Sequence, residues 1–74
     1  MRISVNQNIK LGSNVYHVQT EYYRVSKKIV TNIFKGGMII KRLEKEIDTE
    51  ENIEEQTRNF HEIIVKRIRS IYKN

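Results

Sequence analysis

The segment KIVTNIFKGGMIIKRLEKEI, residues 28–47, decides how this chain folds. Two runs rich in β-branched and other apolar residues flank the dipeptide Gly36-Gly37. Two glycines between such runs are typical of a tight hairpin, because type I′ and II′ turns require positive φ angles, which glycine adopts without steric cost. The segment therefore predicts two antiparallel strands, residues 28–35 and 38–46, joined by a two-residue turn.

The predicted turn also sets which residues pair across the hairpin. With both glycines in the turn, the register pairs Lys35 with Met38, Phe34 with Ile39, Ile33 with Ile40 and Val30 with Leu43. Both faces of this hairpin are then substantially apolar, whereas a half-solvated strand alternates apolar and polar residues. The hairpin is therefore expected to need cover on both faces.

The residues before the hairpin predict two further strands. In residues 2–11 the apolar side chains fall on odd positions, which is the period of a half-buried strand, although Asn6-Gln7-Asn8 suggests a bulge or a break. Gly12-Ser13-Asn14 has the composition of a turn. Residues 15–23 place Tyr16, Val18, Thr20 and Tyr22 on one face, which we expect to be core. Links this short allow only antiparallel neighbours, so the four strands form a meander.

A single long helix is predicted for residues 49–73. Asp48 as N-cap and Glu51 as its reciprocal partner match a capping box. Acidic residues crowd the first turns and basic residues the last, as the helix dipole favours. The apolar stripe that would lie on the sheet comprises Ile53, Phe60, Ile64, Ile68 and Ile71, with Ile63 alongside it. The predicted fold class is thus α+β, a four-stranded antiparallel β-meander packed on one face by a single C-terminal helix.

Length and composition narrow the class of protein. The chain has 74 residues, enough for one small domain, and no Cys, which excludes disulfides and thiolate chemistry and favours a cytoplasmic location. Neither a signal peptide nor a stretch of about 20 apolar residues that could span a bilayer is recognisable.

The charge is unevenly distributed along the sequence. Residues 1–45 hold nine Lys and Arg against two Glu, a net charge of +7, whereas residues 46–74 hold five Lys and Arg against seven acidic residues, a net charge of −2. The positive charge therefore belongs to the predicted sheet.

No constellation in the sequence indicates catalysis, a cofactor or a metal. His17 and His61 lie on different elements, without the close spacing that zinc sites show. His61 is expected to flank the apolar stripe and pack over the sheet edge. The serines lie in no nucleophile motif, and Gly36-Gly37 lacks the remaining residues of a phosphate-binding loop. We therefore expect a protein that is not an enzyme.

A resemblance supports the strand assignment. The segments VYHVQTE (residues 15–21) and IVTNIFKGGMI (residues 29–39) resemble small bacterial proteins of unknown function that carry a YHVQTE strand, a GG hairpin and a C-terminal helix. The resemblance covers the middle of the chain and implies the same strands and turn, but no activity. This chain departs from those proteins at Tyr22, where they tend to have an acidic residue.

The function that the sequence favours is a small protein-interaction module that forms a homodimer. A 25-residue helix, about 37 Å long, would overhang strands of about 26 Å, and one face of the hairpin would lack cover. A self-complementary patch can bury such surfaces in a twofold dimer. The candidate interface residues are Ile29, Ile33, Met38, Ile40, Ile68, Ile71 and Tyr72.

The alternative is a nucleic-acid-binding module that uses the basic sheet. An open sheet that carries aromatic and basic side chains can stack single-stranded bases and bind phosphates. The spacing of aromatic residues and glycines typical of RNA-recognition motifs is absent. The candidate nucleic-acid contacts are Tyr23, Lys27, Lys28, Lys35, Lys41 and Arg42.

Overall fold

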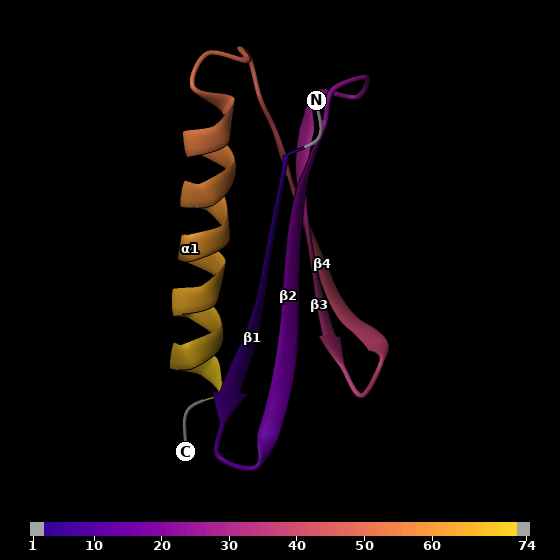
Figure 1. Cartoon of the computed structure of the whole chain (residues 1–74), viewed down its shortest axis with the longest axis vertical. Helices are drawn as coiled ribbons and strands as arrows, with labels where there is room; N and C mark the ends of the chain where they lie inside the picture. The colour runs from indigo at the N-terminus through magenta and orange to yellow at the C-terminus, as the bar shows by residue number, and fades with distance from the viewer. Residues whose placement is uncertain (1–2, 73–74) are drawn as a thin grey trace.

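A computed structural model describes residues 3–72 as a four-stranded sheet and one helix (Figure 1). The elements are β1 (Ser4–Leu11), β2 (Asn14–Tyr23), β3 (Lys28–Lys35), β4 (Met38–Glu46) and α1 (Ile53–Ile71). The strands pair in chain order and every pair is antiparallel, so the predicted meander with one covering helix is confirmed. The first position of the predicted first strand, residue 2, and the last of the predicted helix, residue 73, lie outside the described residues.

The β3–β4 turn has the predicted geometry. Gly36 and Gly37 have φ angles of 59° and 79°, positive at both positions as a type I′ turn requires. The first two predicted pairs, Lys35 with Met38 and Phe34 with Ile39, are present. The tight turn therefore fixes the start of the hairpin register.

Beyond these pairs the predicted register is wrong by one residue. Ile33 pairs with Lys41 rather than Ile40, because a β-bulge places an extra residue in β4 between the partners of Ile33 and Phe34. A one-residue shift moves every later side chain to the other face. Leu43 consequently pairs with Thr31 and lies on the same face as Ile33.

The expectation that Ile29 and Ile33 lie on an uncovered face is wrong as well. Their side chains are 0% and 4% exposed, because this face of β3 is the one that α1 covers. The opposite face of the sheet has no helix over it and is largely polar in β1 and β2, where Asn6 and Asn8 pair with Gln19 and His17. No bulge interrupts β1, whose register with β2 is continuous from Ser4 to Leu11.

The core lies between the sheet and α1. The alternation predicted for the second strand is confirmed, since Tyr16, Val18, Thr20 and Tyr22 are all buried. One apolar cluster occupies the half of the core near the end of α1, and a smaller one lies near its start. The larger cluster contains Ile9, Tyr16, Val18, Ile33, Ile64, Val65 and Ile68, and the smaller contains Tyr22, Ile29 and Ile47.

The helix begins later than predicted, and the predicted capping box does not form. Its N-cap is Asn52, which adopts the left-handed conformation and makes no side-chain cap. The backbone N–H of Glu51 instead donates to the Thr49 hydroxyl, and the Gln56 amide donates to the carbonyl oxygens of Thr49 and Glu51. Residues 49–52 therefore form a turn braced by Gln56 rather than a first helical turn.

This later start removes the predicted overhang. The helix has 19 residues, about 28 Å in length, which matches strands of eight to ten residues at about 3.3 Å each. Ile68 is 3% exposed, so its assignment to an exposed interface is wrong. Ile71 and Tyr72 do remain exposed, and the Tyr72 ring stacks on Tyr16 with 5.1 Å between ring centres. Along residues 3–72, no helix combines the length and apolar character needed to cross a membrane.

Candidate interaction surface on β4 and α1

Strand β4 forms one edge of the sheet and is the element with the least cover. α1 packs over β1, β2 and β3, but its backbone stays clear of β4, and Figure 1 shows the β3–β4 hairpin diverging from the helix. Eight of the nine residues of β4 are exposed, and only Leu43 is half-buried. An edge strand presents a row of unpaired backbone N–H and C=O groups, which can pair with another chain. β4 therefore offers both an open edge and uncovered side chains.

A groove of about 350 Å³ lies between β4 and the second half of α1. Its apolar lining comes from the sheet and the helix and comprises Ile33, Leu43, Ile64, Ile68, Ile71 and Tyr72. Two cations complete the lining, Lys41 on β4 and Arg67 on α1. None of its lining residues is acidic, so the groove combines an apolar floor with positive charge on both walls.

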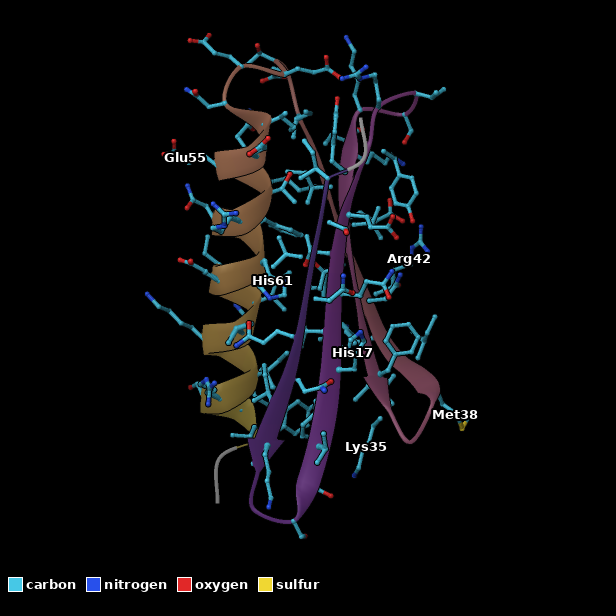
Figure 2. The ribbon with its side chains drawn as sticks, viewed as in Figure 1. His17, Lys35, Met38, Arg42, Glu55 and His61 are labelled. Atoms are coloured by element: carbon cyan, nitrogen blue, oxygen red, sulfur yellow. The ribbon has the colours of Figure 1, made fainter. Side chains whose placement is uncertain are left out.

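The structure brings together only part of the predicted interface. Ile33, Ile68, Ile71 and Tyr72 line the groove, but the first two are buried in its floor. Ile29 is buried in the smaller core cluster, away from the groove. Met38 is 71% exposed, and Ile40 is exposed in the bulge. Figure 2 shows Met38 at the tip of the β3–β4 hairpin. The exposed members of the predicted set are therefore Met38, Ile40, Ile71 and Tyr72.

The predicted nucleic-acid contacts do not form one surface. By the sheet register, Lys28 and Arg42 lie on the face away from α1, whereas Lys35 and Lys41 lie on the helix-covered face. The Lys35 ammonium group is 5.7 Å from the centre of the Tyr16 ring, which belongs to the core. Tyr23 pairs with Lys28 and lies on the same face, and Lys27 lies in the β2–β3 turn. Positive charge is thus divided between two faces.

Glu44 also neutralises part of the basic set on the uncovered face. Its carboxylate lies 3.0 Å from Arg42 Nε and 3.3 Å from Lys28 Nζ. The hydrogen bonds from Arg42 and Lys28 hold the pKa of Glu44 below its usual value. The carboxylate is consequently ionised at neutral pH and offsets one of the two positive charges beside it.

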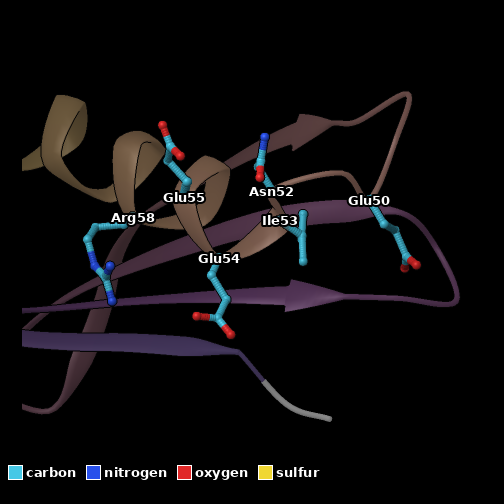
Figure 3. A pocket seen from close by; sticks show the side chains of 6 residues that line it. All are labelled: Glu50, Asn52, Ile53, Glu54, Glu55 and Arg58. Carbon is cyan, nitrogen blue, oxygen red and sulfur yellow. The ribbon is translucent and has the colours of Figure 1, made fainter.

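The opposite end of the molecule is acidic. A hollow of about 510 Å³ lies at the start of α1. Figure 3 shows its lining residues, Glu50, Asn52, Ile53, Glu54, Glu55 and Arg58. The three carboxylates point in different directions rather than toward a common point. Among residues 3–72 no group of His, Asp and Glu is arranged to hold a metal ion. The hollow therefore contributes a negative pole to the molecule rather than a ligand set.

Glu50 ties this acidic end to the sheet. Its carboxylate accepts a short hydrogen bond from the Tyr22 hydroxyl and lies 3.3 Å from Arg24 Nε. The bond from Tyr22 is the main reason that the pKa of Glu50 is lowered. Burial and the Glu50 carboxylate together raise the pKa of Tyr22. This pairing explains why Glu50 does not serve in the first turn of the helix.

His61 does not lie over the sheet edge as the sequence suggested. Its side chain is 2% exposed and points from α1 into the sheet (Figure 2). Nδ1 lies 2.7 Å from the Thr20 hydroxyl, and Nε2 lies 3.0 Å from Gln7 Oε1. The Thr20 hydroxyl is in turn 2.7 Å from that of Thr31. A chain of hydrogen bonds therefore crosses the core from β3 to β1.

The donor of each hydrogen bond in this network can be assigned by starting from Gln7. Gln7 Oε1 accepts, so Nε2 of His61 carries the proton and Nδ1 accepts from the Thr20 hydroxyl. The Thr20 oxygen is then free to accept from Thr31. Burial lowers the pKa of His61, and the nearby Glu62 charge only partly opposes it. These hydrogen bonds require only one proton on the His61 ring, as in a neutral imidazole.

The sequence pattern did not predict this polar group, although one signal was present. Thr20 and Thr31 occupy apolar positions of two strands, at places where the alternation calls for buried side chains. Two buried hydroxyls require partners, and His61 lies on the apolar side of the helix. His17, the other imidazole, lies on the opposite face of the sheet, bonded to Asn8 Oδ1 at 2.8 Å. The two imidazoles are too far apart in the fold to share a metal.

The chain matches no known family model, and no curated protein or solved structure is detectably similar to it. The resemblance to small bacterial proteins with a YHVQTE strand therefore stays a prediction. The geometry of the chain's own residues carries the functional argument.

Proposed function

We propose that this chain is a small, non-enzymatic protein-interaction module of the cytoplasm that self-associates through β4 into a homodimer. The observation that carries the proposal is the open edge of β4, which is exposed along its length and lies beyond the cover of α1. Pairing with another strand satisfies the free backbone groups of such an edge. A second copy of β4 supplies a strand of the same length.

The distribution of charge favours an antiparallel arrangement of the two copies. β4 and α1 run in opposite directions, and the acidic start of α1 lies at the far end of the molecule from the β3–β4 turn (Figure 1). Lys35, Lys41 and Arg67 belong to the half of the molecule near that turn. Two copies related by a twofold axis through β4 would set the acidic end of one beside the basic end of the other. A parallel arrangement would juxtapose like charges.

One register of antiparallel pairing matches the side chains of β4 well. Centring the axis on Leu43 places Leu43 opposite its own copy on the helix-covered face. On the other face it places Arg42 opposite Glu44 of the second copy, twice. The cost is two pairs of lysines, because Lys41 of each copy lies opposite Lys45 of the other; their exposed ammonium groups can diverge into solvent. We propose this register for the homodimer.

Charge-reversal variants test both the dimer and its register. Light scattering on wild-type protein across concentration should give a mass that rises to twice that of the chain. Arg42→Glu replaces two attractive pairs with two repulsive ones and should weaken the dimer by about tenfold or more. The swap Arg42→Glu with Glu44→Arg restores opposite charges and should restore the dimer. Lys10→Glu, on the other edge strand, serves as the matched control.

Two results would contradict the proposal. A wild type that stays monomeric at high micromolar concentration would show that the Lys and Arg side chains of β4 block edge pairing, as such residues do on many edge strands. A fluorescence-anisotropy titration with single-stranded and duplex oligonucleotides addresses the alternative function. Tight binding that falls steeply with salt would identify a nucleic-acid-binding protein instead.

A further inference from the structure

We propose that the groove between α1 and β4 binds a peptide segment of a partner protein in which acidic residues flank large apolar side chains. This site adjoins the dimer contact and shares Lys41 and Leu43 of β4 with it. Strand pairing uses the edge of β4 in the plane of the sheet, whereas the groove lies above that plane, on the helix-covered face.

The floor of the groove specifies the apolar part of the ligand. Leu43 is half-buried and Ile71 is 68% exposed, so their side chains leave apolar surface open to solvent beside the buried Ile64 and Ile68. The volume of about 350 Å³ falls in the lower part of the range of about 300–1,000 Å³ for ligand pockets. That space accommodates a few side chains of the size of Leu or Phe.

The walls specify the charge of the ligand. Lys41 and Arg67 approach the groove from different elements, and neither makes an ion pair with a residue of the described range 3–72. Elsewhere on the sheet the cations Lys28 and Arg42 have a carboxylate within the chain. Cations that line a groove without an acidic neighbour in it complement carboxylates of a ligand.

The same features argue against a nucleic acid at this site. A phosphate backbone would be matched by the two cations but would leave the apolar floor in contact with a charged chain. An acidic, apolar peptide satisfies both the floor and the walls. The chemistry of the groove thus points to a peptide.

A binding titration with three labelled peptides tests the proposal on the full-length chain. The probe is a short peptide that alternates Glu or Asp with Leu and Phe. One control peptide replaces Leu and Phe by Ser, and the other replaces every acidic residue by Lys. The proposal expects saturable binding of the probe below millimolar concentration, with both control peptides at least tenfold weaker. Equal binding of the basic peptide, or no binding of the probe, would overturn it.

Matched variants locate the site on the protein. Arg67→Glu should weaken binding of the probe by about tenfold or more, because it reverses a charge in the groove. Its control is Lys66→Glu, at the neighbouring helical position outside the lining, which should change binding by less than about twofold. Ile71→Ser should likewise weaken binding, with the exposed Ile63→Ser as its control. Control variants that weaken binding as much as the groove variants would overturn the assignment. Arg42→Glu should leave binding intact, which separates this result from failure of the dimer.

Discussion

Replacing Thr20 by Val should destabilise the fold strongly, although the two side chains have nearly the same shape. Thr20 is the middle of the buried chain that joins Thr31, Thr20, His61 and Gln7, and its hydroxyl serves two partners, both 2.7 Å away. The change leaves the Thr31 hydroxyl and Nδ1 of His61 without partners, and both residues are almost fully buried. Each unpaired buried group costs about 1–3 kcal/mol, so the two together give an expected loss of unfolding free energy of about 2–6 kcal/mol.

The order of the hydrogen bonds predicts that the neighbouring variants cost less. Thr31→Val removes only the donor at the end of the chain, because the Thr20 hydroxyl can still donate to His61, and should cost about 0.5–1.5 kcal/mol. Adding His61→Leu to Thr20→Val removes one of the two stranded groups. The double variant should therefore be less destabilised than the sum of the single variants.

Urea unfolding followed by circular dichroism measures these free energies. A Thr20→Val variant no less stable than Thr31→Val would refute the assigned chain. So would additive effects of Thr20→Val and His61→Leu, because independent side chains do not share a hydrogen bond. An unchanged dependence on urea concentration across the variants would show that each unfolds from the same folded state.

The buried hydrogen bonds of His61 also predict how the stability of the fold depends on pH. Burial lowers the pKa of His61 below its ordinary value of 6.5, so the unfolded chain takes up a proton that the folded chain does not. The contribution of His61 is therefore complete above about pH 6.5 and is lost as the pH falls, with a slope of up to about 1.4 kcal/mol per pH unit. The pKa values of Glu44 and Glu50 are lowered in the folded state, so their ionised carboxylates stabilise the fold at neutral pH. This stabilisation is lost as the pH falls and the carboxylates become protonated. His61→Leu should flatten the curve just below about pH 6.5 and leave the loss of stability at acid pH in place.

Three further variants test other parts of the fold. Ile64→Ala opens a cavity beneath α1 and should cost about 2–5 kcal/mol in urea unfolding, since Ile64 is buried in the larger core cluster; a cost below 1 kcal/mol would contradict this packing. Gly36→Ala adds a Cβ that has no atom within 4 Å, so its expected cost of about 1–2 kcal/mol is backbone strain alone, and Gly36→Asn should cost less. Glu50→Gln should lower the pKa of Tyr22 toward its ordinary value in an ultraviolet titration, with Tyr22→Phe identifying the transition.

The elements of this fold were predictable because local rules determine them. Consecutive glycines fix the β3–β4 turn, and alternation in β2 fixes its buried face, in each case through interactions within a few residues. The bulge in β4 follows no such rule, because an extra residue changes the pairing without changing composition. Its effect on the site was large, since it moved Leu43 to the face that lines the groove.

The start of α1 was mispredicted for a tertiary reason. The sequence around Asp48 and Glu51 satisfies the capping-box pattern, but the packing of Tyr22 and Arg24 against Glu50 holds residues 49–52 in a turn. The contact spans 28 positions between Tyr22 and Glu50, which no local pattern contains. The candidate site was likewise visible only in part, because the lining of the groove comes from three separate elements.

Amide hydrogen exchange of β4 at low and high protein concentration tests the central claim, edge pairing of two copies, most directly. In the monomer, amides of β4 that do not donate to β3 face solvent and exchange rapidly. The dimer predicts that their protection rises with concentration, centred on Leu43, while the amides of the other edge strand, β1, do not change. Protection of β4 that is independent of concentration, or that rises in β1 instead, would contradict the account.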